Sequence, residues 1–109
     1  MTNLSQEHAA ADGTAPLLSG AEVARLQEEV PTWRIEDGKL TRDVKVRNFK
    51  EALALVNRLG EVADAENHHP DMLLHSWNRV RIQLYTHTVN GLSRNDFIMA
   101  ARFEEILPR

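Results

Sequence analysis

Apolar and polar positions repeat with two different periods along this chain, and the periods divide it into helices and strands. An apolar stripe at helical spacing predicts a short helix over residues 19–29, opened by a capping box of Ser19 with Glu22 and ended by Pro31. Alternating apolar residues then predict two strands between residues 33 and 47, joined by an Asp-Gly turn at residues 37–38. The chain therefore opens with a helix and a β-hairpin.

A long helix is predicted over residues 49–66, opened by Asn48 and Glu51 as a second capping box. Two apolar stripes run along it. The first, predicted to face the sheet, contains Phe49, Leu53, Val56, Gly60 and Ala63. The second contains Leu55, Leu59 and Val62. It predicts either a wide core-facing surface or a subunit interface.

Two further strands are predicted near residues 73–77 and 79–86, the second with strict alternation. A loop over residues 88–91 leads to a last helix, which Ser93 and Asp96 cap and which extends to about Leu107. The order is helix, two strands, long helix, two strands, helix. This order predicts an α+β fold, in which a four-stranded antiparallel sheet has three helices packed on one face.

The first 18 residues have no periodicity and are rich in Ala, Gly, Thr, Ser and Asn. We expect residues 1–18 to form a disordered or loosely attached N-terminal tail, with His8 taking no part in the chemistry. Residues 19–109 are predicted to form a single domain.

Composition narrows the classes of function. The chain has 109 residues, 42% of them hydrophobic, and a formal net charge of -3. It has no basic stripe of the kind that binds nucleic acid, no apolar run of membrane-spanning length and no secretory leader. The absence of cysteine excludes thiol chemistry and disulfides. These features predict a cytoplasmic protein that contacts neither nucleic acid nor membrane directly.

Candidate chemistry gathers in the C-terminal half, where histidines can exchange protons near neutral pH. His68 and His69 are adjacent and precede Pro70, and His87 follows the predicted last strand. Pro70 implies an irregular helix end, which could let both histidines line one pocket, and His87 could come alongside them. Asp64, one turn before His68, could orient that ring. A shared site and separate exposed or buried histidines both remain open.

Other interpretations compete at several positions. Three imidazoles with Asp96 could hold a catalytic zinc ion, but adjacent histidines chelate poorly, so we expect no metal site. Asp96 has a sufficient role as a helix cap without any chemistry. Trp33 and Trp77 are predicted to be core or pocket-wall aromatics, and Arg42 breaks its strand's apolar alternation, so it lies at an edge or reaches toward a partner.

One order of residues matches a known family signature, which consists of an acidic residue, His-His-Pro, an aromatic residue, His and Asp. The matching positions are Asp64, His68-His69-Pro70, Trp77, His87 and Asp96, and Trp33, Arg42 and Phe49 match upstream. Over about residues 19–107 the chain thus resembles the pterin-4a-carbinolamine dehydratases. It departs from the family pattern at Asn95, where members often have arginine, and it carries His75, which we do not assign to the site.

The resemblance implies an enzyme that dehydrates 4a-hydroxytetrahydropterin to quinonoid dihydropterin, in the recycling of tetrahydrobiopterin, without a metal or organic cofactor. It implies His68 and His69 as the acid–base pair and His87 as a residue that orients substrate or shares the proton load. Asp64, Pro70, Trp77 and Asp96 would be substrate-binding residues, with Asp96 holding His87 or a pterin amine. Which histidine is the acid remains open.

The resemblance also implies partners. We expect a homodimer or homotetramer and, through the pathway, an aromatic amino-acid hydroxylase as a partner. The alternative function is a non-catalytic protein-binding module that acts as a dimerisation cofactor or hydroxylase partner, using the helical surface of Leu55, Leu59 and Val62.

Overall fold

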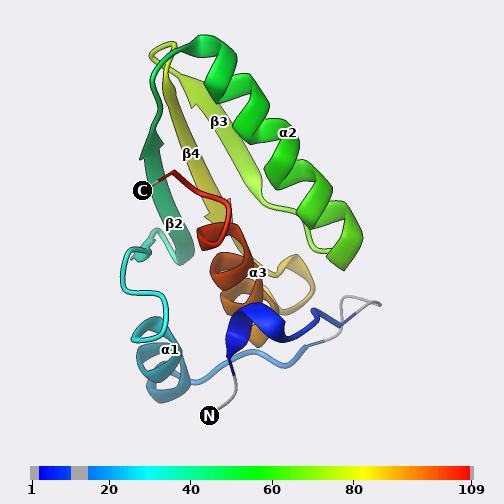
Figure 1. Cartoon of the computed structure of the whole chain (residues 1–109). Helices are drawn as coiled ribbons and strands as arrows, with labels where there is room; N and C mark the ends of the chain where they lie inside the picture. Colours follow the sequence, from blue (N-terminus) through cyan, green and yellow to red (C-terminus); the bar gives the residue numbers. More distant parts are fainter. Residues whose placement is uncertain (1–2, 11–14, 109) are drawn as a thin grey trace.

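A four-stranded antiparallel sheet forms the centre of the computed structural model, which describes residues 3–10 and 15–108 (Figure 1). Across the sheet the strands lie in the order β1 (Arg34–Glu36), β2 (Lys39–Lys45), β4 (Arg79–Leu84) and β3 (Asp71–His75). The α-helices are α1 (Gly20–Gln27), α2 (Phe49–Glu66) and α3 (Arg94–Glu104), and two short 3-10 helices are η1 (Leu4–Gln6) and η2 (His87–Val89). The predicted α+β class, with three helices and a four-stranded antiparallel sheet, is confirmed.

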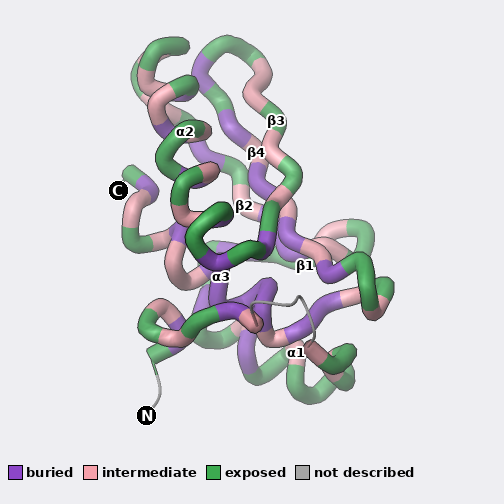
Figure 2. Tube along the Cα trace, turned by 90° about the vertical axis from the view of Figure 1, so that its right-hand side faces the viewer, coloured by how far each residue is buried: buried purple, intermediate pink, exposed green. Residues whose placement is uncertain are grey.

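Strand register turns one face of the sheet toward the helices. Leu40 pairs with Leu84 and Val44 with Val80, so alternating residues of β2 and β4 share one apolar face. The side chains of this face are buried under α2 and α3, both of which contact β4 (Figure 2). In the described ranges, no helix has both the length and the apolar character that a membrane span requires.

Local capping signals fix where the helices begin. Ser19 and Glu22 form the predicted capping box at α1. At α2, Asn48 accepts a hydrogen bond from the Glu51 amide at 2.9 Å, but the Glu51 carboxylate bonds Arg47 instead of the Asn48 amide. The second predicted capping box is therefore only half formed. Asn67 ends α2 in the left-handed region, with φ of 50°.

For the second predicted stripe on α2 the structure selects the core-facing alternative, whereas the first stripe was predicted wrongly at Phe49 and Leu53. Leu55 and Leu59, predicted as the second stripe, are completely buried in the core. Phe49 and Leu53, predicted to face the sheet, are 49% and 47% exposed. The buried face of α2 combines these leucines with Ala52 and Ala63, whose small side chains let the helix approach the sheet closely. The exposed apolar stripe is therefore that of Phe49 and Leu53.

Arg42 lies on the helix-covered face, opposite Ile82, and reaches Glu104 at the end of α3. The Glu104 Oε1 atom accepts hydrogen bonds from Arg42 Nε at 2.8 Å, Trp33 Nε1 at 3.0 Å and Thr32 Oγ1 at 2.8 Å. Burial alone would raise the pKa of Glu104, but the hydrogen bonds from Arg42 and Thr32 outweigh it and lower the pKa. The carboxylate therefore joins α3 to β2 in its charged form.

Glu104→Gln tests this junction. A carboxyl whose pKa is lowered in the folded state stabilises the fold above its unfolded pKa, and this contribution is lost as the pH falls through the folded pKa. At pH 7 we expect the variant to lose about 1–2 kcal/mol of unfolding free energy, measured with urea. The deficit should shrink as the pH falls below 4.5, the ordinary value. Glu105→Gln, at the exposed neighbouring position, is the control. If Glu104→Gln lost as much unfolding free energy below pH 4.5 as at pH 7, Glu104 would not join α3 to β2 through its charge.

Residues 3–10 differ from the predicted loose tail. Leu4 is only 2% exposed, and η1 packs against α3. His8, predicted to be uninvolved, bonds the Glu66 carboxylate at 3.0 Å. These contacts join residues that lie far apart in the sequence, so local composition gave no sign of them. The part of the predicted tail at residues 1–2 and 11–14 lies outside the described residues.

Candidate active site

One shallow depression of about 230 Å³ gathers the three histidines of the predicted site. His68 and His69 follow the end of α2, and His87 begins η2 after β4. Figure 1 shows how the C-terminal end of α2 comes beside the loop that follows β4. Tyr85 and Thr86 complete the wall between the histidines. The fold therefore brings His68, His69 and His87 to one surface, as a shared site requires.

His68 is held by a buried carboxylate. Its Nε2 atom donates to Asp96 Oδ1 at 2.7 Å, and the two residues are 8% and 0% exposed. Of the two partners predicted for Asp96, His87 or a pterin amine, the structure contradicts His87, because Asp96 bonds His68. A carboxylate that fixes one ring nitrogen sets the tautomer and leaves the other nitrogen to exchange protons.

Asp96 is itself fixed by further hydrogen bonds. Its Oδ2 atom accepts from Thr86 Oγ1 at 2.7 Å and from the Ser93 amide at 3.0 Å. The Ser93 bond is the predicted cap of α3, so the capping role and the His68 bond use different oxygens of one carboxylate. Asp96 lies behind His68 and is not among the residues that line the depression. Its predicted contact with substrate stays a prediction, and its observed partner is His68.

His69 also bonds a carboxylate, but this one is exposed to solvent. Its Nε2 atom donates to Asp64 Oδ1 at 2.8 Å, and the two side chains are 57% and 81% exposed. Asp64 was predicted to orient His68, which the structure contradicts. The left-handed backbone at Asn67 reverses the chain after α2, so the residue one turn back from His68 meets His69.

His87 stands at the rim of the depression beside Tyr85. The two rings meet edge to face, with centroids 5.1 Å apart and an interplanar angle of 72°. The Tyr85 hydroxyl donates to Asn90 Oδ1 at 2.6 Å, which anchors the ring. Sequence reasoning missed Tyr85 and Thr86. The signal was their position immediately before His87 at the end of a strongly alternating strand.

Trp77 does not belong to this site. It lies in the turn between β3 and β4, is 59% exposed and has a positive φ of 56°. That turn is at the opposite end of the sheet from the C-terminal end of α2 (Figure 1). Pro70 leads from His69 into β3 but does not line the depression. The predicted contacts of Trp77 and Pro70 with substrate are therefore not supported by the fold.

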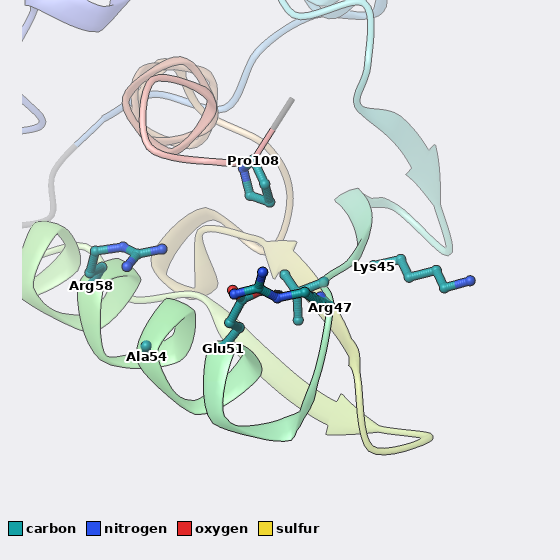
Figure 3. Close-up of a pocket in the computed structure, with 7 residues that line it drawn as sticks. Lys45, Arg47, Glu51, Ala54, Arg58 and Pro108 are labelled. Atoms are coloured by element: carbon teal, nitrogen blue, oxygen red, sulfur yellow. Dashed lines mark hydrogen bonds and ion pairs between the residues drawn. The ribbon is translucent and has the colours of Figure 1, made fainter.

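A larger groove of about 480 Å³ lies elsewhere, between the first half of α2 and Pro108 (Figure 3). Its charged groups are Lys45, Arg47, Arg58 and Glu51, and Arg47 pairs with Glu51 at 2.8 Å. It contains no imidazole and is remote from the histidines, so it lacks groups that exchange protons near neutral pH. Among residues 3–10 and 15–108, no group of three or more His, Cys, Asp or Glu side chains is arranged to hold a metal ion.

The depression can therefore support acid–base chemistry on a small ligand. Two imidazoles, His68 and His69, each have Nε2 committed to a carboxylate, which leaves Nδ1 of each ring as the nitrogen that can exchange a proton. One of them is buried and fixed, whereas the other is exposed to solvent. Such a pair can remove a proton from one position of a ligand and supply a proton to another.

Comparisons with known proteins agree on one family. The family model described as pterin 4 alpha carbinolamine dehydratase matches residues 16–106. A relative in Rubrobacter xylanophilus, with the provisional name pterin-4-alpha-carbinolamine dehydratase, is 42% identical over 95 residues, covering 86% of this chain and 88% of the relative. A similarly named relative in Gloeobacter violaceus is 44% identical over 96 residues, covering 84% and 82%. A crystal structure described as a transcriptional coactivator/pterin dehydratase from Brucella melitensis is similar, with a TM-score of 0.77 and 28% identity, covering 84% of this chain and 99% of that one.

Proposed function

This chain belongs to the pterin 4 alpha carbinolamine dehydratase family, whose members are hydro-lyases, and we propose that it dehydrates 4a-hydroxytetrahydropterin by histidine acid–base catalysis. The observation that carries the proposal is the buried His68–Asp96 pair at the wall of the depression. It presents a tautomerically fixed imidazole to a small ligand.

The reaction removes a hydroxyl group from carbon 4a and a proton from a ring nitrogen, and releases water and the quinonoid dihydropterin. Hydroxide is a poor leaving group, so an acid must protonate the departing oxygen while a base takes the nitrogen proton. Both transfers are within reach of imidazoles near pH 7. Histidine side chains of the chain can therefore supply the proton to the departing oxygen and accept the proton from the ring nitrogen.

We assign the base to His68 and the acid to His69. With Nε2–H donated to Asp96, neutral His68 has an unprotonated Nδ1, and the carboxylate stabilises the imidazolium that forms when a proton is taken. His69 is 57% exposed at its side chain, so it can recover its proton from solvent after each turnover. His87, at the rim beside Tyr85, orients the pterin ring. The physiological role that we propose is tetrahydrobiopterin recycling alongside an aromatic amino-acid hydroxylase.

The test is the dehydration rate of freshly generated 4a-hydroxytetrahydropterin, followed by its ultraviolet change with and without chelator. Acceleration by the folded chain that survives chelator supports the proposal. No acceleration would refute it and would favour the second candidate, a protein-binding module. One observation supports that candidate, namely that the similar Brucella melitensis protein is described as a transcriptional coactivator as well as a pterin dehydratase.

We also propose that the chain forms a homo-oligomer through the exposed stripe of Phe49 and Leu53 on α2. Apolar side chains grouped on one exposed helix face are typical of subunit contacts. Leu53→Glu should therefore reduce the native mass, measured by light scattering after size exclusion, to that of one chain. Ala24→Glu, an equal charge change at an exposed position on α1, should leave the mass unchanged. A wild-type mass of 12.4 kDa, that of one chain, would contradict the proposal.

A further inference from the structure

Residues 3–10, which we call the N-terminal clasp, are bonded to both elements that carry the His68–Asp96 pair. They lie outside the part of the chain that the family model matches, residues 16–106. Two consecutive backbone amides make the connection. The Ala9 amide donates to Glu66 Oε1 at 2.8 Å, and the Ala10 amide donates to Asn95 Oδ1 at 3.1 Å. Glu66 comes two residues before His68, and Asn95 immediately precedes Asp96.

The clasp is itself firmly attached to α3. Glu7 forms a two-point ion pair with Arg94, with Nε–Oε1 and Nη2–Oε2 distances of 2.8 and 2.6 Å. Arg102 donates from Nε to the Glu7 carbonyl at 2.8 Å, and Leu4 is buried in the core. Two-point arginine–carboxylate pairs fix orientation as well as distance. The amides of Ala9 and Ala10 are therefore presented at a defined position.

The buried Glu66 carboxylate accepts hydrogen bonds from two residues of the clasp, His8 and Ala9. A carboxylate at the C-terminal end of a helix faces the negative end of the helix dipole, and the Glu66 side chain is only 8% exposed. Burial alone would raise its pKa, but hydrogen bonds from His8 and the Ala9 amide, with the charge of Arg102, lower the pKa instead. The clasp supplies the first two of these.

Asn95 depends on the clasp in a second way. The residue is 3% exposed, and its Nδ2 atom has no hydrogen-bond partner among the described residues. The bond from the Ala10 amide to Oδ1 is therefore the side-chain contact that fixes this amide. The clasp thus orders the residue directly beside Asp96.

We propose that the N-terminal clasp holds the end of α2 and the start of α3 at the separation that the 2.7 Å His68–Asp96 bond requires, so that Glu66 and Asn95 are positioning residues for His68. His68 and Asp96 belong to different elements, and a shift between those elements would lengthen their bond directly. Misplacement by about 1 Å can lower a rate by about 10²-fold. The effect on rate rests on the proposed function, whereas the effect on the His68–Asp96 bond does not.

The test compares Glu66→Ala with Glu66→Gln in the full chain. Alanine removes the acceptor of the Ala9 amide, whereas glutamine keeps an Oε1 acceptor. We expect Glu66→Ala to lower kcat by about tenfold with KM nearly unchanged, and glutamine to restore about half of the wild-type kcat. Glu7→Gln weakens the ion pair with Arg94 and should also lower kcat. It replaces Glu66→Ala as the test variant if Glu66→Ala does not fold.

Nuclear magnetic resonance supplies a readout that does not need activity. The proton between His68 Nε2 and Asp96 Oδ1 should exchange with water about tenfold faster in Glu66→Ala than in the wild type. Val44→Ala, a buried change on β2 away from the clasp, is the control for general destabilisation. Wild-type exchange in Glu66→Ala, or equally faster exchange in Val44→Ala, would overturn the proposal. A wild-type chain with no dehydratase activity would instead refute the proposed function. The proton-exchange measurement would still test whether the clasp holds the His68–Asp96 bond.

Discussion

We expect His68→Ala to lower the rate of pterin dehydration by about 10²–10⁴-fold, the range typical for the loss of a general acid or base. The reason is geometric, because His68 is the one histidine of the depression whose ring is both buried and fixed by a buried carboxylate. The loss should fall on kcat more than on KM, because proton transfer takes place in the transition state. Stopped-flow ultraviolet measurements on the folded variant check this.

The matched control for this prediction is His75→Ala. His75 lies at the far end of β3, bonds Ser76 and does not line the depression. Its replacement should leave kcat within about twofold of the wild-type value, well inside the range of a residue without a chemical role. Near-normal activity in folded His68→Ala would exclude His68 as the base and would direct attention to His69 and His87.

Asp96→Asn should lower both activity and stability. An amide in place of the carboxylate removes the charge that stabilises the His68 imidazolium, and the same change in the unrelated Ser-His-Asp triad of serine proteases lowers kcat by about 10⁴-fold. The other carboxylate oxygen, Oδ2, accepts hydrogen bonds from Thr86 and Ser93, and Asp96 is fully buried. The unfolding free energy should therefore fall by about 1–3 kcal/mol, measured with urea at pH 7.

Combining the two replacements separates the roles of Asp96. If Asp96 acts on the chemistry only through His68, the double variant of His68→Ala and Asp96→Asn should be no slower than His68→Ala alone. Asp71→Asn, an exposed aspartate on β3, is the control for the loss of one negative charge. Additive losses in the double variant would instead assign Asp96 a contact of its own with the substrate.

The elements of the fold were predictable because their signals are local. Each α-helix begins at a capping residue whose partner lies three residues further along the chain; the capping residues are Ser19, Asn48 and Ser93. Strict alternation of apolar and polar residues marks β4. The stripes on α2 were not resolved in this way. Large apolar residues suggested a core face at Phe49 and Leu53, whereas the buried face pairs leucines with small alanines. Which stripe packs on the sheet depends on tertiary contacts that periodicity does not contain.

The histidines of the site were predictable, but the rest of its lining and the carboxylate partners of the histidines were not. The three histidines meet at one depression, which is one of the two arrangements that the sequence left open. Asp64, expected to orient His68, bonds His69, and Asp96, expected to hold His87 or a pterin amine, bonds His68. The directions of adjacent side chains such as His68 and His69 depend on the backbone angles of the irregular segment after α2, where Asn67 has a positive φ. The contacts of residues 3–10 were equally hidden, because Glu7 and Arg94 are 87 positions apart.

The double use of Asp96 limits how the family can change over generations. A substitution there should harm the start of α3 as well as the proposed catalytic pair, so we expect selection for folding alone to preserve it even in a descendant that does not turn over pterin. His69 and His87 are exposed and hold no buried element in place. We therefore expect lineages that abandon catalysis to lose His69 and His87 first, and to keep Asp96 as a remnant of the site.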